Sequence, residues 1–160
     1  MPFPEEVLAL FTRLGCEDVS ETEGPVVPAD RLLELAHALK EELDYRFFVY
    51  CAAAHFPAVE PKDEEDEGRP AHFIVAYRLR KVGPNSNSVP FYTTVQMDGS
   101  CPSLTPLFAG ADWQEREQFD LVGVHFTDHP DLRRIMMPED WPGHPLQRDY
   151  AIDTAHHPWR

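Results

Sequence analysis

The prolines near the C-terminal end constrain the fold of this chain more than any other feature. After Gly123 they stand at Pro130, Pro138, Pro142, Pro145 and Pro158. Proline breaks helices, removes a sheet hydrogen bond and pushes the preceding residue to an extended conformation. We therefore expect the residues after Gly123 to form an ordered but irregular, extended segment, here called the C-terminal strap. Its large apolar residues must be buried against the chain's own domain or against another subunit, and the pattern leaves both possibilities open. These residues are Ile135, Met136, Met137 and Trp141.

The part of the chain before the strap changes from a helical to an alternating pattern. Apolar residues at helical spacing predict helices over Pro4–Leu14 and Ala29–Leu43. Strands are then predicted over Tyr45–Phe56, His72–Lys81 and Val89–Met97, the last two joined as a hairpin by the turn residues between them. The first strand is apolar on both alternations, which is typical of a strand covered on two sides or central in a sheet. This order predicts an α+β fold of two layers, with N-terminal helices on a small, mainly antiparallel sheet.

A short charged helix is expected between this domain and the strap. Asp112 and Glu115 have the spacing of a capping box that would start a helix at Trp113, and the helix should end at Gly123. We expect residues 1–110 to form the α+β domain and residues 111–160 to form the charged helix and the strap, within a single structural unit.

The charges of this helix support two hypotheses. Glu117 and Asp120, three residues apart, could act as an acid–base pair if burial raised one pKa. The interpretation we prefer is structural: Arg116 neutralises the helix carboxylates, and Arg133 and Arg134 of the strap complete an ion-pair clamp.

Composition excludes several classes of function. The formal net charge of −14 argues against nucleic-acid binding, because phosphates would be repelled. No apolar run approaches the ~18–20 residues of a membrane span, and the acidic N-terminus does not resemble a signal peptide. Cys16, Cys51 and Cys101 are too widely spaced for a cluster site and are expected to be buried thiols. The acidic run 60–67 is interpreted as a solvated loop, with an acidic docking site as the alternative.

Histidines near the C-terminus raise a metal hypothesis. A stand-alone metal hydrolase could use them together with Asp128, Asp131 or Asp149, but no His-Glu-x-x-His pattern is present. We expect a histidine before proline to orient a turn instead. The histidines are His125, His129, His144, His156 and His157. The sequence also has no glycine-rich phosphate loop and no nucleophile motif, so the residues alone predict a domain without a cofactor whose strap serves in interaction.

A nearly continuous motif across residues 113–150 is similar to one known family. The motif reads Glu115-Arg116-Glu117-x-x-Asp120, then Gly123, then His129-Pro130-Asp131-Leu132-Arg133-Arg134-Ile135, then Asp140-Trp141-x-Gly143-His144-Pro145-Leu146-x-x-Asp149-Tyr150. It resembles the thirty-kilodalton subunit, also called the C-type subunit, of respiratory complex I, the proton-pumping NADH:quinone oxidoreductase. Residues 1–100 agree with that family only in the order of elements. Leu121-Val122, Thr127-Asp128 and Gln147 depart mildly from its usual pattern.

The resemblance implies a scaffold subunit of the hydrophilic arm that binds no cofactor itself. It would brace the D-type quinone-site subunit near the iron–sulfur subunits, with FMN, iron–sulfur clusters and quinone on those partners. The place implied is peripheral, on the cytoplasmic side of the bacterial inner membrane. The alternative is the equivalent subunit of a membrane-bound hydrogenase or formate hydrogenlyase-type complex. The resemblance favours burial of the strap against a neighbour, with interface residues Glu115, Arg116, Glu117, Asp120, His129, Pro130, Arg133, Arg134, Trp141 and His144.

Overall fold

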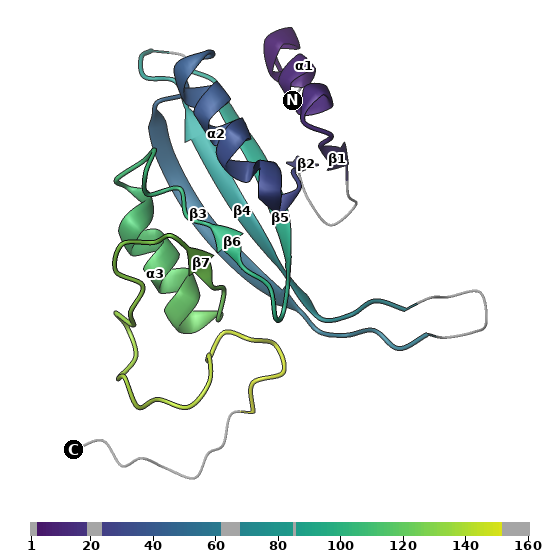
Figure 1. Cartoon of the computed structure of the whole chain (residues 1–160), viewed down its shortest axis with the longest axis vertical. Coiled ribbons are helices and arrows are strands. Elements are labelled where there is room, and N and C mark those ends of the chain that lie inside the picture. Colours follow the sequence, from purple (N-terminus) through teal and green to yellow (C-terminus); the bar gives the residue numbers. More distant parts are fainter. Residues whose placement is uncertain (1–2, 19–23, 62–67, 85, 152–160) are drawn as a thin grey trace.

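The computed structural model describes residues 3–18, 24–61, 68–84 and 86–151. Helix α2 (Leu32–Glu41) lies across one face of a five-stranded sheet, and helix α1 (Glu5–Arg13) packs beside α2 (Figure 1). The strand order is β1-β2-β5-β4-β3, antiparallel except between β2 and β5. The strands are β1 (Glu17–Asp18), β2 (Pro25–Val26), β3 (Phe47–Phe56), β4 (His72–Arg80) and β5 (Ser88–Gln96). This mixed α/β arrangement with a mainly antiparallel sheet confirms the coarse fold prediction.

The core lies between the helices and one face of this sheet. Most of the predicted apolar stripe of α2 is fully buried, including Leu35 and Leu39, but Leu43 lies beyond the end of the helix and is only partly buried. A 3-10 turn at Ala29–Arg31 (η1) precedes α2. From the sheet, alternate residues of β4 such as Val75 and Tyr77 meet this stripe. The predicted hairpin agrees with β4 and β5 to within one residue at each end, because strict alternation and a polar turn define both strands.

Strand β3 was expected to be either covered on two sides or central in the sheet, and the second alternative is wrong because β3 is an edge strand. Its outer edge is closed by helix α3 (Ala111–Leu121), which lies beside it in Figure 1. The backbone N–H groups of Cys51 and Ala53 donate to the side-chain oxygens of Gln114 and Gln118, at 2.6 and 2.9 Å. Exposed edge N–H groups promote unwanted pairing, so these glutamines protect the sheet. The face of β3 that points away from α2 stays largely uncovered, which the sequence pattern did not predict.

Two further short strands connect the end of the sheet to the strap. Strand β6 (Cys101–Pro102) pairs in parallel with β7 (Phe126–Thr127). After β7, the described residues 128–151 contain neither helix nor strand. None of the helices in the described part of the chain is long and apolar enough to cross a membrane.

Candidate assembly site on helix α3 and the C-terminal strap

Helix α3 does not begin as the sequence predicted. Its first residue is Ala111 and its N-cap is Gly110, which offers no side chain for capping, so the capping-box prediction is wrong. The carboxylate of Asp112 instead lies 3.6 Å from His129 Nε2 and 4.0 Å from Arg116 Nη1. Because Asp112 is the second residue of α3, it lies inside the helix and cannot cap it.

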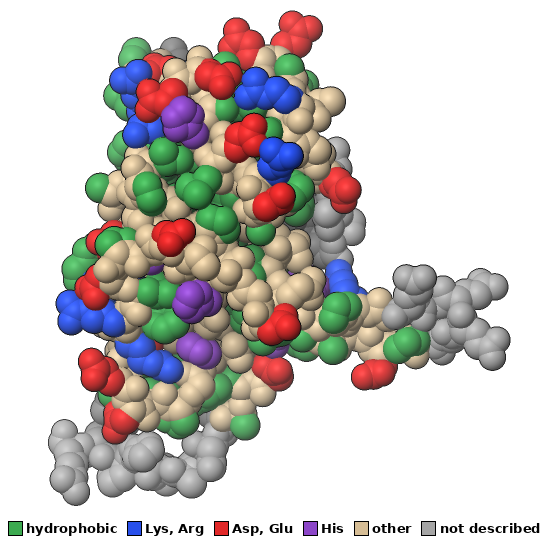
Figure 2. Space-filling model, viewed as in Figure 1, with side chains coloured by type: hydrophobic (Ala, Val, Ile, Leu, Met, Phe, Trp, Pro, Cys, Tyr) green, Lys and Arg blue, Asp and Glu red, His purple; other side chains and the backbone are tan. Residues whose placement is uncertain are grey.

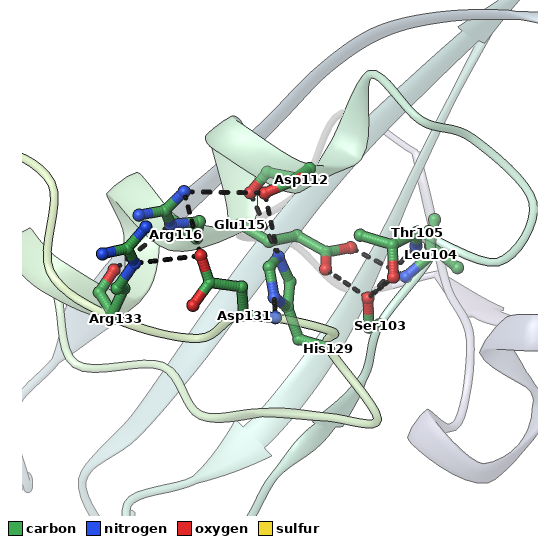
Figure 3. A network of polar contacts seen from close by, with 9 residues as sticks. All are labelled: Ser103, Leu104, Thr105, Asp112, Glu115, Arg116, His129, Asp131 and Arg133. Atoms are coloured by element: carbon green, nitrogen blue, oxygen red, sulfur yellow. Dashed lines mark hydrogen bonds and ion pairs between the residues drawn. The ribbon is translucent and has the colours of Figure 1, made fainter.

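Glu115, the other residue of the expected box, is completely buried and points away from the arginines (Figure 3). It accepts hydrogen bonds from the Ser103 hydroxyl at 2.6 Å and from the Leu104 backbone N–H at 2.8 Å. Burial raises its pKa to about 7, although these two hydrogen bonds lower it and Asp112 raises it slightly. The predicted place of Glu115 in the ion-pair clamp is wrong, because it ties α3 to the loop after β6.

Asp120 is the point at which the strap is attached to α3. Its fully buried carboxylate accepts hydrogen bonds from the backbone N–H groups of Ile135, Met136 and Met137, at 2.9, 2.6 and 2.9 Å. Arg134 Nη1 donates to its other oxygen at 3.0 Å. Burial raises the pKa of Asp120, but the hydrogen bonds outweigh burial and hold it below its ordinary value. The structure thus pairs Arg134 with Asp120, and the three backbone donors fix the path of the strap.

Arg116 and Arg133 are joined through Asp131 rather than through the helix carboxylates (Figure 3). Arg133 Nε lies 2.9 Å from the Asp131 carboxylate, and Arg116 Nη1 lies 3.7 Å from the same oxygen. Arg116 is buried, stacks on Trp113 at 4.9 Å and donates to the Arg133 carbonyl at 3.3 Å. Glu117 makes no ion pair within the described residues, so its predicted neutralisation by Arg116 is wrong.

The two histidines of the motif bind backbone groups. His129 Nδ1 accepts the N–H of Asp131 at 3.1 Å, and its Nε2 donates to the Asp112 carbonyl at 3.2 Å. His144 Nδ1 donates to the Asp120 carbonyl at 2.9 Å. Both rings therefore set the path of the strap along α3. Within the described residues no three His, Cys, Asp or Glu side chains form a group that could hold a metal ion; His156 and His157 lie outside those residues.

The C-terminal end of α3 is capped by strap residues that the sequence did not reveal. The Leu146 N–H donates to the Leu121 carbonyl at 2.9 Å, and the Gln147 side chain donates to the Val122 carbonyl at 2.8 Å. Gly123 permits this approach: its φ is +95°, and a Cβ there would lie 2.7 Å from the His144 ring. Gln147 stood out only as a departure from the family pattern, and its neutral amide suits a carbonyl acceptor.

The remaining predicted residues and several apolar ones form the outer surface of this site. Pro130 is exposed and Trp141 is half-buried. Arg133 exposes 67 % of its side chain, and Trp113, Met136 and Leu146 are also largely exposed on the ordered backbone. The described geometry holds α3 and the strap together and leaves apolar and cationic groups facing outward, which is the chemistry of an assembly site.

Comparison with known proteins identifies the family. The model of the "Respiratory-chain NADH dehydrogenase, 30 Kd subunit" family matches residues 25–156. The C-type subunit of the NADH-quinone oxidoreductase of Moorella thermoacetica is 36 % identical over 152 residues, which are 95 % of each chain. Its counterpart in Geobacter sulfurreducens is 35 % identical over 140 residues, covering 84 % of this chain and 80 % of the relative. The chain belongs to this thirty-kilodalton subunit family.

Two solved structures share the fold. A trypsin-resistant fragment of Nqo5, residues 1–134, is 26 % identical, with a TM-score of 0.57 over 80 % of this chain and 98 % of the fragment. A chain from the membrane-bound sulfane sulfur reductase, an archaeal respiratory membrane complex, has a TM-score of 0.68 at 20 % identity, covering 92 % of this chain and 85 % of that one. The second likeness shows the fold alone.

Proposed function

We propose that this chain is a scaffold subunit of the hydrophilic arm of an NADH:quinone oxidoreductase, and that it binds no cofactor of its own. Membership of the thirty-kilodalton subunit family supports the proposal, as do the relatives from NADH-quinone oxidoreductases that match over most of their length. FMN, the iron–sulfur clusters and quinone are then carried by partner subunits. The complex is attached to a membrane, and this chain sits peripherally on the cytoplasmic side of the bacterial inner membrane.

One observation supports the assembly role most directly: hydrogen bonds to Asp120 hold the strap on α3, while large apolar side chains stay exposed to solvent. A carboxylate that satisfies three consecutive backbone N–H groups holds residues 135–137 in one path without help from a helix or a strand. The exposed Met136 therefore stands on an ordered backbone, and an ordered apolar side chain loses less conformational entropy on binding than a mobile one. The proposed partner of this surface is the D-type subunit that forms the quinone site.

The same geometry disfavours the acid–base hypothesis for the helix carboxylates. In the proposed pair of Glu117 and Asp120, Asp120 accepts hydrogen bonds from three backbone N–H groups of the strap and from Arg134. Burial raises the pKa of Asp120, but these hydrogen bonds outweigh burial, so its pKa is not raised as the hypothesis requires. A general base needs a free lone pair within reach of a substrate proton. Asp120 uses its lone pairs on these internal donors, so the pair lacks one of its two members and the role of Asp120 is structural.

The second candidate is the equivalent subunit of a related membrane complex, such as a membrane-bound hydrogenase, that takes electrons from a donor other than NADH. The fold it shares with the chain from the archaeal respiratory complex favours keeping this candidate. Mass spectrometry of the subunits that co-purify from membranes separates the two. An NADH-oxidising flavoprotein subunit supports the first candidate, and a nickel-binding partner supports the second.

Reversing the charge of Arg133 tests the proposed surface. We expect Arg133→Glu to weaken retention of the chain in the complex while leaving the isolated chain folded, because its side chain is mostly exposed and its one ion pair is at the surface. Arg31→Glu is the matched control: it breaks a 2.9 Å ion pair with Glu34 at similar exposure, but on the 3-10 turn before α2.

The measurement is quantitative mass spectrometry of subunits in complexes purified through a tagged partner, with the melting temperature of each isolated variant. An Arg133→Glu complex that keeps its full set of subunits would show that this surface does not hold the partner. Equal loss with Arg31→Glu would show that net charge, not this surface, matters.

A further inference from the structure

The sheet has a second face, opposite helix α2, that carries an unusual set of side chains. The register places Phe47 opposite Arg80, Tyr50 opposite Arg78, and Ala52 opposite Ala76, all on neighbouring strands β3 and β4. We call Phe47, Tyr50, Ala52, Ala54, Arg78 and Arg80 the arginine–aromatic face. Phe47 is 46 % exposed, Ala52, Ala54 and Arg80 are exposed, and Tyr50 and Arg78 are half-buried.

These residues are not typical of a sheet face that is exposed only to solvent. An antiparallel sheet with one solvated face alternates apolar residues toward the core with polar residues outward. In β3 the outward positions are instead aromatic or alanine, which is why the sequence indicated a strand covered on two sides. The helices cover only one of those sides (Figure 1). The apolar pattern of β3 therefore remains unexplained by the described part of this chain alone.

The charge of this face is opposite to that of the protein. Strands β3, β4 and β5 contain no aspartate or glutamate, although the chain has a net charge of −14. The helix-covered side, by contrast, shows many acidic side chains, particularly near α1 and α2 (Figure 2). The opposite face is thus a basic, aromatic area on an acidic molecule.

The two guanidinium groups are positioned but not neutralised. Arg80 stacks over the Phe47 ring at 5.0 Å, and Arg78 over the Tyr50 ring at 5.5 Å. Neither forms an ion pair with a carboxylate within the described residues, and the buried Nε of Arg78 has no hydrogen-bond partner there. An arginine already held on a ring loses little entropy when its planar fork binds a carboxylate.

We propose that the arginine–aromatic face is a second docking surface, for a protein segment that presents aspartate or glutamate side chains between apolar ones. The carboxylates would bind Arg78 and Arg80, and Ala52 and Ala54 leave room for the close approach of the segment's backbone. A polyphosphate or an anionic membrane is disfavoured, because the net charge of −14 repels an extended polyanion. The inference rests on the proposed function, in which the chain is one part of a larger complex, and it adds a neighbour on the face opposite α2.

Site-specific photo-cross-linking in the intact complex tests this surface. A benzophenone amino acid replaces Ala52 or Ala54 on this face, Leu33 on helix α2, or Trp113 on helix α3. After irradiation of membranes, the cross-linked peptides are identified by mass spectrometry. We expect positions 52 and 54 to cross-link to a partner segment that contains aspartate or glutamate, and Leu33 to give much less product. Cross-links to lipid, to a second copy of this chain or to a basic segment would overturn the proposal.

A charge swap provides the second measurement. Arg80→Glu should reduce retention of the chain in the complex by about tenfold, because a charge-assisted contact becomes a repulsion. Changing the carboxylate of the cross-linked segment to lysine should restore it. Arg31→Glu is again the control. Because Arg80 is exposed, we expect the melting temperature of the isolated Arg80→Glu chain to stay close to that of the wild type.

The outcomes separate this inference from the proposed function. Cross-links from Trp113 to a partner without any from positions 52 and 54 would refute the second surface and leave the assembly role intact. A wild-type chain that co-purifies with no partner would refute both.

Discussion

Removing the ionisable group of Glu115 should make stability less dependent on pH. The carboxyl group is completely enclosed by α3 and the loop after β6, and its pKa lies at about 7 against 4.5 in the unfolded chain. The folded state therefore holds a proton that the unfolded state releases between these two values. As pH rises from about 4.5 to about 7, this group lowers the stability of the folded chain, and above about 7 its effect is constant.

The magnitude follows from the two pKa values. Each pKa unit corresponds to about 1.4 kcal/mol, so the interval from 4.5 to about 7 corresponds to about 3 kcal/mol. Glutamine at position 115 matches the neutral, protonated side chain in size and can still accept the Leu104 N–H. We therefore expect Glu115→Gln to equal the wild type near pH 4.5 and to be about 3 kcal/mol more stable near pH 8.

Urea unfolding at both pH values, followed by circular dichroism, measures this difference. Comparing the variant with the wild type at each pH cancels the contribution of the other carboxylates to the free energy of unfolding, because both proteins share them. Glu117→Gln removes the same charge from the same helix and reports the general effect of lowering the net charge. A Glu115→Gln variant whose advantage over the wild type is the same at both pH values would show that Glu115 does not change protonation in this range.

Two further substitutions test how the strap is held. Gly123→Ala should destabilise the chain by about 1–3 kcal/mol in urea unfolding, because alanine is strained at a φ of +95° and its Cβ would collide with the His144 ring. Gly15→Ala is the control for strain without collision, because Gly15 has a φ of +67° and open space around it. Equal losses of stability in the two variants would exclude the collision. Asp120→Asn should speed amide hydrogen exchange at Met136 and Met137 at least about tenfold, whereas Asp140→Asn on the exposed strap should not, and unchanged exchange would contradict the anchoring role.

The sequence predicted the hairpin and the end of α3 because short-range chemistry determines them. Alternation over His72–Lys81 and Val89–Met97 lies within one residue of the observed strands β4 and β5. Gly123 ends α3 because glycine readily adopts the positive φ, +95° here, that turns the chain out of the helix. The pairing of Asp120 with Arg134 could also be anticipated, since opposite charges on a helix and on the segment beside it are available to each other.

The contacts that could not be predicted from the sequence are those that involve uncharged residues or residues far apart in the chain. The Asp112–Glu115 spacing is that of a capping box, but Glu115 is buried and accepts hydrogen bonds from Ser103 and Leu104. These two residues are uncharged, so nothing in the sequence marks them as partners of Glu115. Likewise, the apolar residues at both alternations of β3 indicate that both faces of the strand are suited to burial. The sequence does not show whether this chain or another one covers each face. Within residues 3–18, 24–61, 68–84 and 86–151, the helices cover one face of β3, and Gln114 and Gln118 protect its edge.

The way the strap is stabilised bears on how such a protein joins a complex. Residues 128–151 have no helix or strand, so their order depends on a few anchors such as Asp120, His144 and Gln147 rather than on the main core. A segment held in this way opens locally at a lower free energy than the whole domain unfolds. A partner that binds the strap only in its ordered form therefore stabilises that form, by a free energy that rises with the logarithm of the partner's concentration relative to its dissociation constant. The internal anchors set the path in advance, and the neighbour's contacts then act on a surface that is already formed.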